Sequence, residues 1–153
     1  MRIVMICCVG LLLALPARAE NPAPYSGMRT VETGQAFAAY VDSLEKAARG
    51  NGMGIVAHAC ATCGAKAIGV TIPDNHVVMI FHPRFAVRML KSSVAAGIEA
   101  PIRLYLTEKS DGTARLTYRQ PSHIFGAYEV PAIDDIAKEL DGIVAKIVAD
   151  AGK

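Results

Sequence analysis

The spacing of apolar residues along the chain predicts four helices. Residues 35–49 and 85–94 carry apolar side chains at the three- and four-residue intervals of amphipathic helices. A brief helix is expected over residues 60–68, closed by Gly69, and a final helix begins at Pro131 with Ile133, Ile136, Leu140, Ile143 and Ile147 on one face. The residues that follow Pro121 are predicted to form a loop.

Strands are predicted between these helices. Residues 77–81 are an unbroken apolar run typical of a buried strand, and Asp111-Gly112 is the turn of a hairpin. The other expected strands cover residues 28–33, which Gly34 ends, and residues 53–58, 102–106 and 114–119. Helices mixed with a hairpin and single strands predict an α+β fold, in which the helices pack on one face of a mainly antiparallel sheet.

The N-terminal segment has the pattern of a signal peptide. Arg2 precedes an apolar run over residues 3–15, and Pro16-Ala17-Arg18-Ala19 supplies an Ala-x-Ala cleavage pattern. The run is shorter than the roughly 20 residues that span a bilayer. We therefore expect a signal peptide at residues 1–19, a flexible leader at residues 20–27 and one domain at residues 28–153. A retained anchor is the alternative; otherwise the protein is periplasmic or secreted, with no stable membrane span after cleavage.

Charge and motifs narrow the possible functions. The chain has 16 Lys and Arg residues against 14 Asp and Glu residues, with no basic run, which argues against a nucleic-acid partner. It shows no Ser-His-Asp set, no glycine-rich phosphate loop and no carboxylate pair, so ordinary hydrolytic catalysis is not expected. Whether the protein is an enzyme of another kind stays open.

The chemically distinctive feature is the sequence His58-Ala59-Cys60-Ala61-Thr62-Cys63. Cys60 and Cys63 are the only cysteines left after signal cleavage, and their spacing allows a small disulfide, redox exchange or one shared metal ion. His58, Cys60 and Cys63 are candidate ligands for Cu(I) or Zn(II), which bind thiolate and imidazole. For these two cysteines, the interpretation that we place first is an inert disulfide that fixes the start of a helix. Two unpaired thiols are a further alternative.

The other residues considered for a functional role are the remaining histidines and one proline. His82 follows the buried strand and is a candidate for lining a ligand pocket, although a structural role is the commoner outcome for a lone histidine. His76, in a predicted turn, and His123, in a predicted loop, are expected to be solvated. Pro101 follows the cysteines at the distance of the cis-proline in thioredoxin-like proteins, which makes that fold a rival interpretation.

Several stretches resemble the DUF302 family, and in particular its exported members. They are residues 73–81, residues 86–90 and the long run from Gly97 through Asp111-Gly112 to Pro121. The resemblance implies a β-α-β(4)-α type domain similar to the TATA-binding-protein-like architecture, and often a homodimer. It implies no activity. The corner Phe81-His82-Pro83-Arg84 departs from the family pattern Phe-Gly-Asn-Pro, so His82 would make that corner more basic.

From these features we expect an exported binding or accessory protein, with a metal ion or small ligand at the cysteine cluster. One alternative is a thiol–disulfide redox protein that uses Cys60 and Cys63. The other is a structural dimer with an inert disulfide.

Overall fold

We describe residues 25–153 of a computed structural model of the chain, so the predicted signal peptide lies outside the described residues. Within residues 25–153, five strands form one sheet in the order β1-β5-β4-β3-β2, and all neighbours are antiparallel. The strands are β1 (Met28–Ala36), β2 (Gly54–Cys60), β3 (Asn75–Phe81), β4 (Ile102–Glu108) and β5 (Thr113–Arg119). β1 and β2 are therefore the two edges of the sheet.

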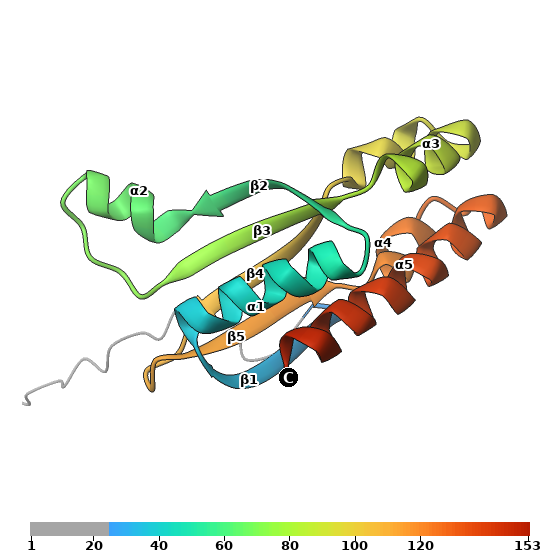
Figure 1. Cartoon of the computed structure of the whole chain (residues 1–153). Coiled ribbons are helices and arrows are strands. Elements are labelled where there is room, and N and C mark those ends of the chain that lie inside the picture. The colour runs from blue at the N-terminus through green and yellow to red at the C-terminus, as the bar shows by residue number, and fades with distance from the viewer. Residues whose placement is uncertain (1–24) are drawn as a thin grey trace, which may run out of the picture.

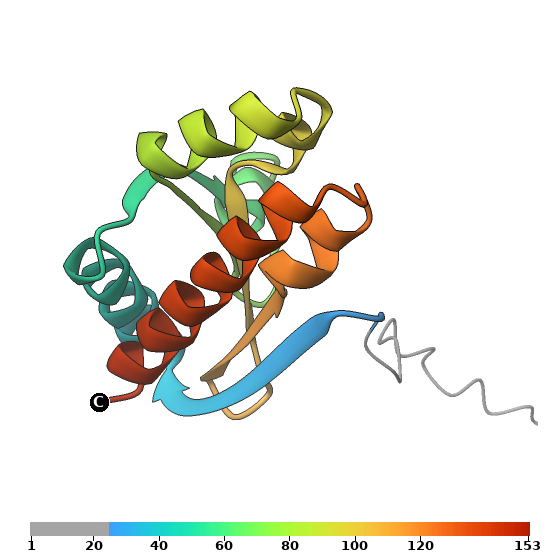
Figure 2. The same ribbon diagram turned by 90° about the vertical axis from the view of Figure 1, so that its right-hand side faces the viewer.

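The long helices lie together on one face of this sheet. Helices α1 (Phe37–Gly50) and α5 (Pro131–Ala151) pack side by side there (Figures 1 and 2). The shorter helices are α2 (Ala61–Ala67), α3 (Pro83–Ser92), the 3₁₀ helix η1 (Ala95–Glu99) and α4 (Pro121–Gly126). Apart from these shorter helices, the chain order is one strand, a helix, four strands and a closing helix. This order confirms the predicted α+β fold of β-α-β(4)-α type. Among residues 25–153, no helix combines the length and the apolar character needed to cross a membrane.

The core lies between the helices and the sheet. Alternate residues of the central strands, among them Val78, Leu104 and Leu116, are fully buried on the helix side, as the period of two in their sequence requires. The buried face of α5 consists of Ile133, Ile136, Ala137, Leu140, Val144, Ile147 and Ala151. Removal of these side chains from water is the main favourable contribution to the folded state.

Two local predictions are wrong. The segment after Pro121 is not a loop but helix α4, where Pro121 occupies the first turn and Phe125 is only 2% exposed. Proline suits that position because its nitrogen has no hydrogen to leave unpaired. Gly34 does not end β1 either, because the strand continues to Ala36 through an irregularity in its pairing with β5. Gly34 has a positive φ of 66°, which glycine adopts without strain.

Candidate functional site

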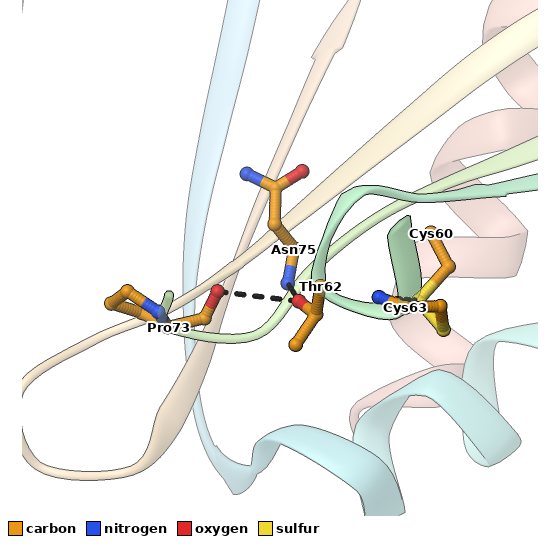
Figure 3. The surroundings of a disulfide bond; sticks show 5 residues. All are labelled: Cys60, Thr62, Cys63, Pro73 and Asn75. Carbon is orange, nitrogen blue, oxygen red and sulfur yellow. Dashed lines mark hydrogen bonds between the residues drawn. A yellow bond between two sulfur atoms is a disulfide. The ribbon is translucent and has the colours of Figure 1, made fainter. Parts of the chain in front are cut away.

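Cys60 and Cys63 are joined by a disulfide at the junction of β2 and α2 (Figure 3). Their Cα atoms are 5.2 Å apart. Cys60 is the last residue of β2 and the N-cap of α2, where its Sγ accepts a hydrogen bond from the Cys63 N–H at 3.0 Å. A side chain that accepts from the free N–H groups of the first turn favours a helix start at this point. The structure therefore places both sulfurs at the beginning of the predicted short helix.

Thr62, between the two cysteines, attaches α2 to the start of β3. Its hydroxyl accepts a hydrogen bond from the Asn75 N–H at 2.8 Å and donates one to the Pro73 carbonyl at 3.3 Å (Figure 3). Helix α2 has no buried side chain of its own. The hydrogen bonds of Thr62 and the disulfide therefore fix the position of α2, because no side chain of this helix packs into the hydrophobic core.

His76 lies beside the disulfide, in β3 and not in the solvated turn that its sequence context predicts. It pairs with Cys60 in the β2–β3 register, and the two Sγ atoms and one imidazole nitrogen lie within 4.8 Å of one another. Its ring meets the Phe37 ring edge-on, with centroids 5.3 Å apart. The Nδ1 atom of His76 is buried and has no hydrogen-bond partner. We call Cys60, Cys63 and His76 the thiol–imidazole group.

His58 points to the same face of the sheet but lies outside the thiol–imidazole group. It pairs with Val78, and its Nε2 is 2.9 Å from a carboxylate oxygen of Glu45 on α1. The His58 and His76 rings are 6.3 Å apart between centroids. His58, the ligand predicted from the sequence, is therefore next to the group and in contact with Glu45. The histidine that lies with the sulfurs is His76, from the neighbouring strand β3.

His82 lies at the opposite end of β3. It is the N-cap of α3, and its Nδ1 accepts a hydrogen bond from the Arg84 N–H at 3.1 Å. It also lines a small apolar pocket of about 30 Å³, room for about one water molecule. The other lining residues are Met53, Ile80, Phe81, Phe85, Ala86, Met89, Ala100, Pro101, Ile102, Phe125 and Leu140.

Pro101 belongs to the His82 end of the sheet. The Ala100–Pro101 bond is cis, as in the thioredoxin interpretation, and Ile102 pairs with Ile80 near the end of β3. Cys60, in contrast, pairs with His76 near the start of β3. The described residues therefore lack the thioredoxin arrangement, in which that proline lies beside the sulfurs.

The thiol–imidazole group has different chemistry in its two redox states. The disulfide leaves neither sulfur available as a metal ligand, since thiolates are the form that binds metals. Reduction would release two thiolates beside an imidazole nitrogen, a donor set suited to soft ions such as Cu(I) and to Zn(II).

Comparison with known proteins gives relatives that are named as channels. The chain is 23% identical over 112 residues to "Fluoride-specific ion channel FluC 1" of Brucella suis and of Brucella abortus. The matched segment covers 73% of this chain, but only 44% and 42% of those two proteins. The chain thus spans less than half the length of these curated relatives.

A solved structure and a family model agree on the domain. The crystal structure of an uncharacterized conserved DUF302 protein from Bacillus stearothermophilus matches with a TM-score of 0.74 and 19% identity, over 82% of this chain and 98% of that chain. At this identity the match shows the fold. The family model "Domain of unknown function DUF302" matches residues 29–151, nearly the whole described chain. The protein therefore belongs to the DUF302 family.

Proposed function

We propose that the protein binds a soft metal ion through Cys60, Cys63 and His76 when the disulfide is reduced. The observation that carries this proposal is the distance of at most 4.8 Å that separates each pair of ligand atoms in the thiol–imidazole group. The unpaired, buried Nδ1 of His76 supports it, because a buried polar atom without a partner costs free energy that a ligand could recover. The proposal replaces His58 by His76 as the nitrogen ligand.

Cu(I) is the ion that this donor set favours. Two thiolates are soft ligands, and softness selects Cu(I) and Zn(II) over the hard divalent ions. Structural zinc sites are closed by four protein ligands. Within residues 25–153, the group supplies three. Zn(II) would therefore need a further ligand, from water or from another molecule.

Export to an oxidising compartment accounts for the disulfide, which persists in a periplasm or outside the cell, whereas cytosolic thiols are kept reduced. In such a compartment a reductant must open the disulfide before a metal ion can bind. We propose that the mature protein begins near residue 20 and works there as an accessory binding protein. Fluoride transport is the property of relatives more than twice as long as the matched segment, and it does not form part of this proposal.

Metal affinity of the reduced protein tests the proposal. We expect the protein, reduced under anaerobic conditions, to bind one Cu(I) in competition with a chromophoric chelator. The His76→Ala variant should bind it at least about tenfold more weakly, since even groups that only support a metal ligand cost 10- to 100-fold when removed. His58→Ala is the matched control, because His58 lies on the same face of the sheet but has its Nε2 atom 2.9 Å from a carboxylate oxygen of Glu45.

Three outcomes decide between the alternatives. If the Cys60→Ser, Cys63→Ser double variant binds Cu(I) as tightly as the parent, the metal site does not exist. If His58→Ala and not His76→Ala weakens binding, the nitrogen ligand is the one predicted from sequence. If the double variant loses only stability, the disulfide is an inert staple. Thermal unfolding of each apo variant separates loss of a ligand from loss of the fold.

A further inference from the structure

The two sulfurs of the disulfide lie in different surroundings. Cys60 is half-buried at the end of β2, whereas Cys63 is exposed in the first turn of α2. Helix α2 stands at the end of the sheet (Figure 1), and none of its residues is buried. Cys63 is therefore the more exposed residue of the pair, and the one that offers itself to a thiol from solvent.

The hydrogen bond at the helix start also distinguishes the sulfurs. In thiol–disulfide exchange the attacked sulfur forms a new bond and the other sulfur leaves as a thiolate. The N–H of Cys63 points at Cys60 Sγ, 3.0 Å away, so it stabilises negative charge on Cys60. Hydrogen bonds to a charged partner are stronger than neutral ones, so this bond strengthens as the charge develops.

We propose that an external thiolate opens the disulfide at Cys63, with Cys60 as the leaving group. The incoming sulfur bonds to Cys63 Sγ, the Cys60–Cys63 bond breaks, and its electron pair goes to Cys60 Sγ. A second thiol then attacks the sulfur of the mixed disulfide that came from the reductant. It releases Cys63 as a thiolate and leaves the reductant as its own disulfide, so two electrons enter the protein.

The charge next to Cys63 indicates the class of thiol. Lys66 follows Cys63 by three residues on α2, so both lie on the same side of the helix. It is the one charged residue of α2, and the next charge along the chain, Asp74, has a backbone N–H bonded to the Glu108 carboxylate. An anionic thiol, such as glutathione, is therefore favoured over a cationic one. This exchange also regulates the proposed metal site, because the two sulfurs can bind a metal ion only after it; that consequence rests on the proposed function.

Mapping the mixed disulfide tests which sulfur is attacked. Oxidised protein is mixed with glutathione, quenched in acid at short times and alkylated, and the peptide that contains both cysteines is sequenced by mass spectrometry. We expect glutathione on Cys63 and the alkyl group on Cys60. Glutathione on Cys60, or equally on both, would overturn the proposal, as would a disulfide that does not react.

The choice of an anionic thiol has its own test. Exchange rates per thiolate are compared for glutathione and cysteamine. At low salt the ratio of the glutathione rate to the cysteamine rate should be about two- to fivefold higher in the parent than in Lys66→Gln, the size of an effect from one surface charge. The same ratio in the parent and in Lys66→Gln would overturn this choice. Because Cu(I) affinity is measured on fully reduced protein, that measurement can fail or succeed independently of both tests.

Discussion

Two buried side-chain atoms of the described residues have no hydrogen-bond partner, the Tyr40 hydroxyl and the His76 Nδ1. Each such atom costs free energy in the folded state, and their surroundings differ. His76 lies against two sulfurs, where a metal ion could use the imidazole. Tyr40 lies 1% exposed among the apolar residues of the core. The His76 Nδ1 therefore supports a binding role, whereas the unpaired Tyr40 hydroxyl is a cost to stability.

Tyr40→Phe should stabilise the protein. The substitution removes the orphan hydroxyl and keeps the ring, so the free energy of unfolding should rise by about 1 kcal/mol, the low end of the penalty for an unpaired buried group. Burial first, and then nearby Tyr118, raises the pKa of Tyr40 to about 12. The unfolded chain therefore loses this proton near pH 10, before the folded protein does, and stability falls between pH 10 and 12.

Urea unfolding of both proteins at pH 7 and at several values up to pH 11 measures the two effects. The loss of stability above pH 10 should be smaller in Tyr40→Phe than in the parent. A variant that is less stable at pH 7 would show that the hydroxyl has a partner in solution, such as a buried water.

At the scale of the element, α2 depends on polar and covalent attachment instead of core packing. Seven residues are too few for a stable isolated helix, and none of its side chains is buried. Thr62 joins it to the residues just before and at the start of β3, where His76 follows Asn75 directly. The distance between the sulfurs and the imidazole is therefore controlled by the threonine hydroxyl as well as by the β2–β3 pairing.

Thr62→Val should loosen α2 and leave the core unchanged. Valine keeps the shape of threonine but leaves the half-buried Asn75 N–H without its acceptor, which costs about 1–3 kcal/mol. Hydrogen exchange followed by mass spectrometry should show faster exchange in residues 61–75 and no change in β4. Thr62→Ser is the matched control, because it retains the hydroxyl. Equal exchange in parent and valine variant would show that the disulfide alone holds the helix.

The sequence predicts the elements of this fold better than it predicts their pairing. Apolar spacing is sufficient for α1, α5 and the central strands, because their buried faces follow one clear period. It misses α4, whose six residues give less than two turns of pattern. It also misses His76, which it assigns to a turn, because β3 begins at Asn75, two residues before the expected strand. The register that places Cys60 opposite His76 depends on a bulge in β2 between Ile55 and Ala57, and a shift of one residue would place Asn75 opposite Cys60.

At the scale of the whole molecule, the two ends of β3 each carry a histidine that is a candidate for ligand binding. His76 and the disulfide lie at its start, and His82 follows its end. His82 follows His76 by six positions, which in extended chain correspond to roughly 20 Å. The open pocket and the cis-proline both belong to the His82 region. The thiol–imidazole chemistry is therefore confined to one end of the sheet.

His82→Ala should consequently affect stability and not metal binding. It removes the cap of α3, and loss of an N-cap costs about 1 kcal/mol of unfolding free energy. Cu(I) affinity of the reduced variant should match that of the parent. Because the two histidines share no contact, the stability effects of His82→Ala and His76→Ala should add within about 0.5 kcal/mol in the double variant. Chemical unfolding of the four apo proteins measures this sum. A coupling above about 1 kcal/mol, or weaker Cu(I) binding in His82→Ala, would mean that β3 transmits a change from one end of the sheet to the other.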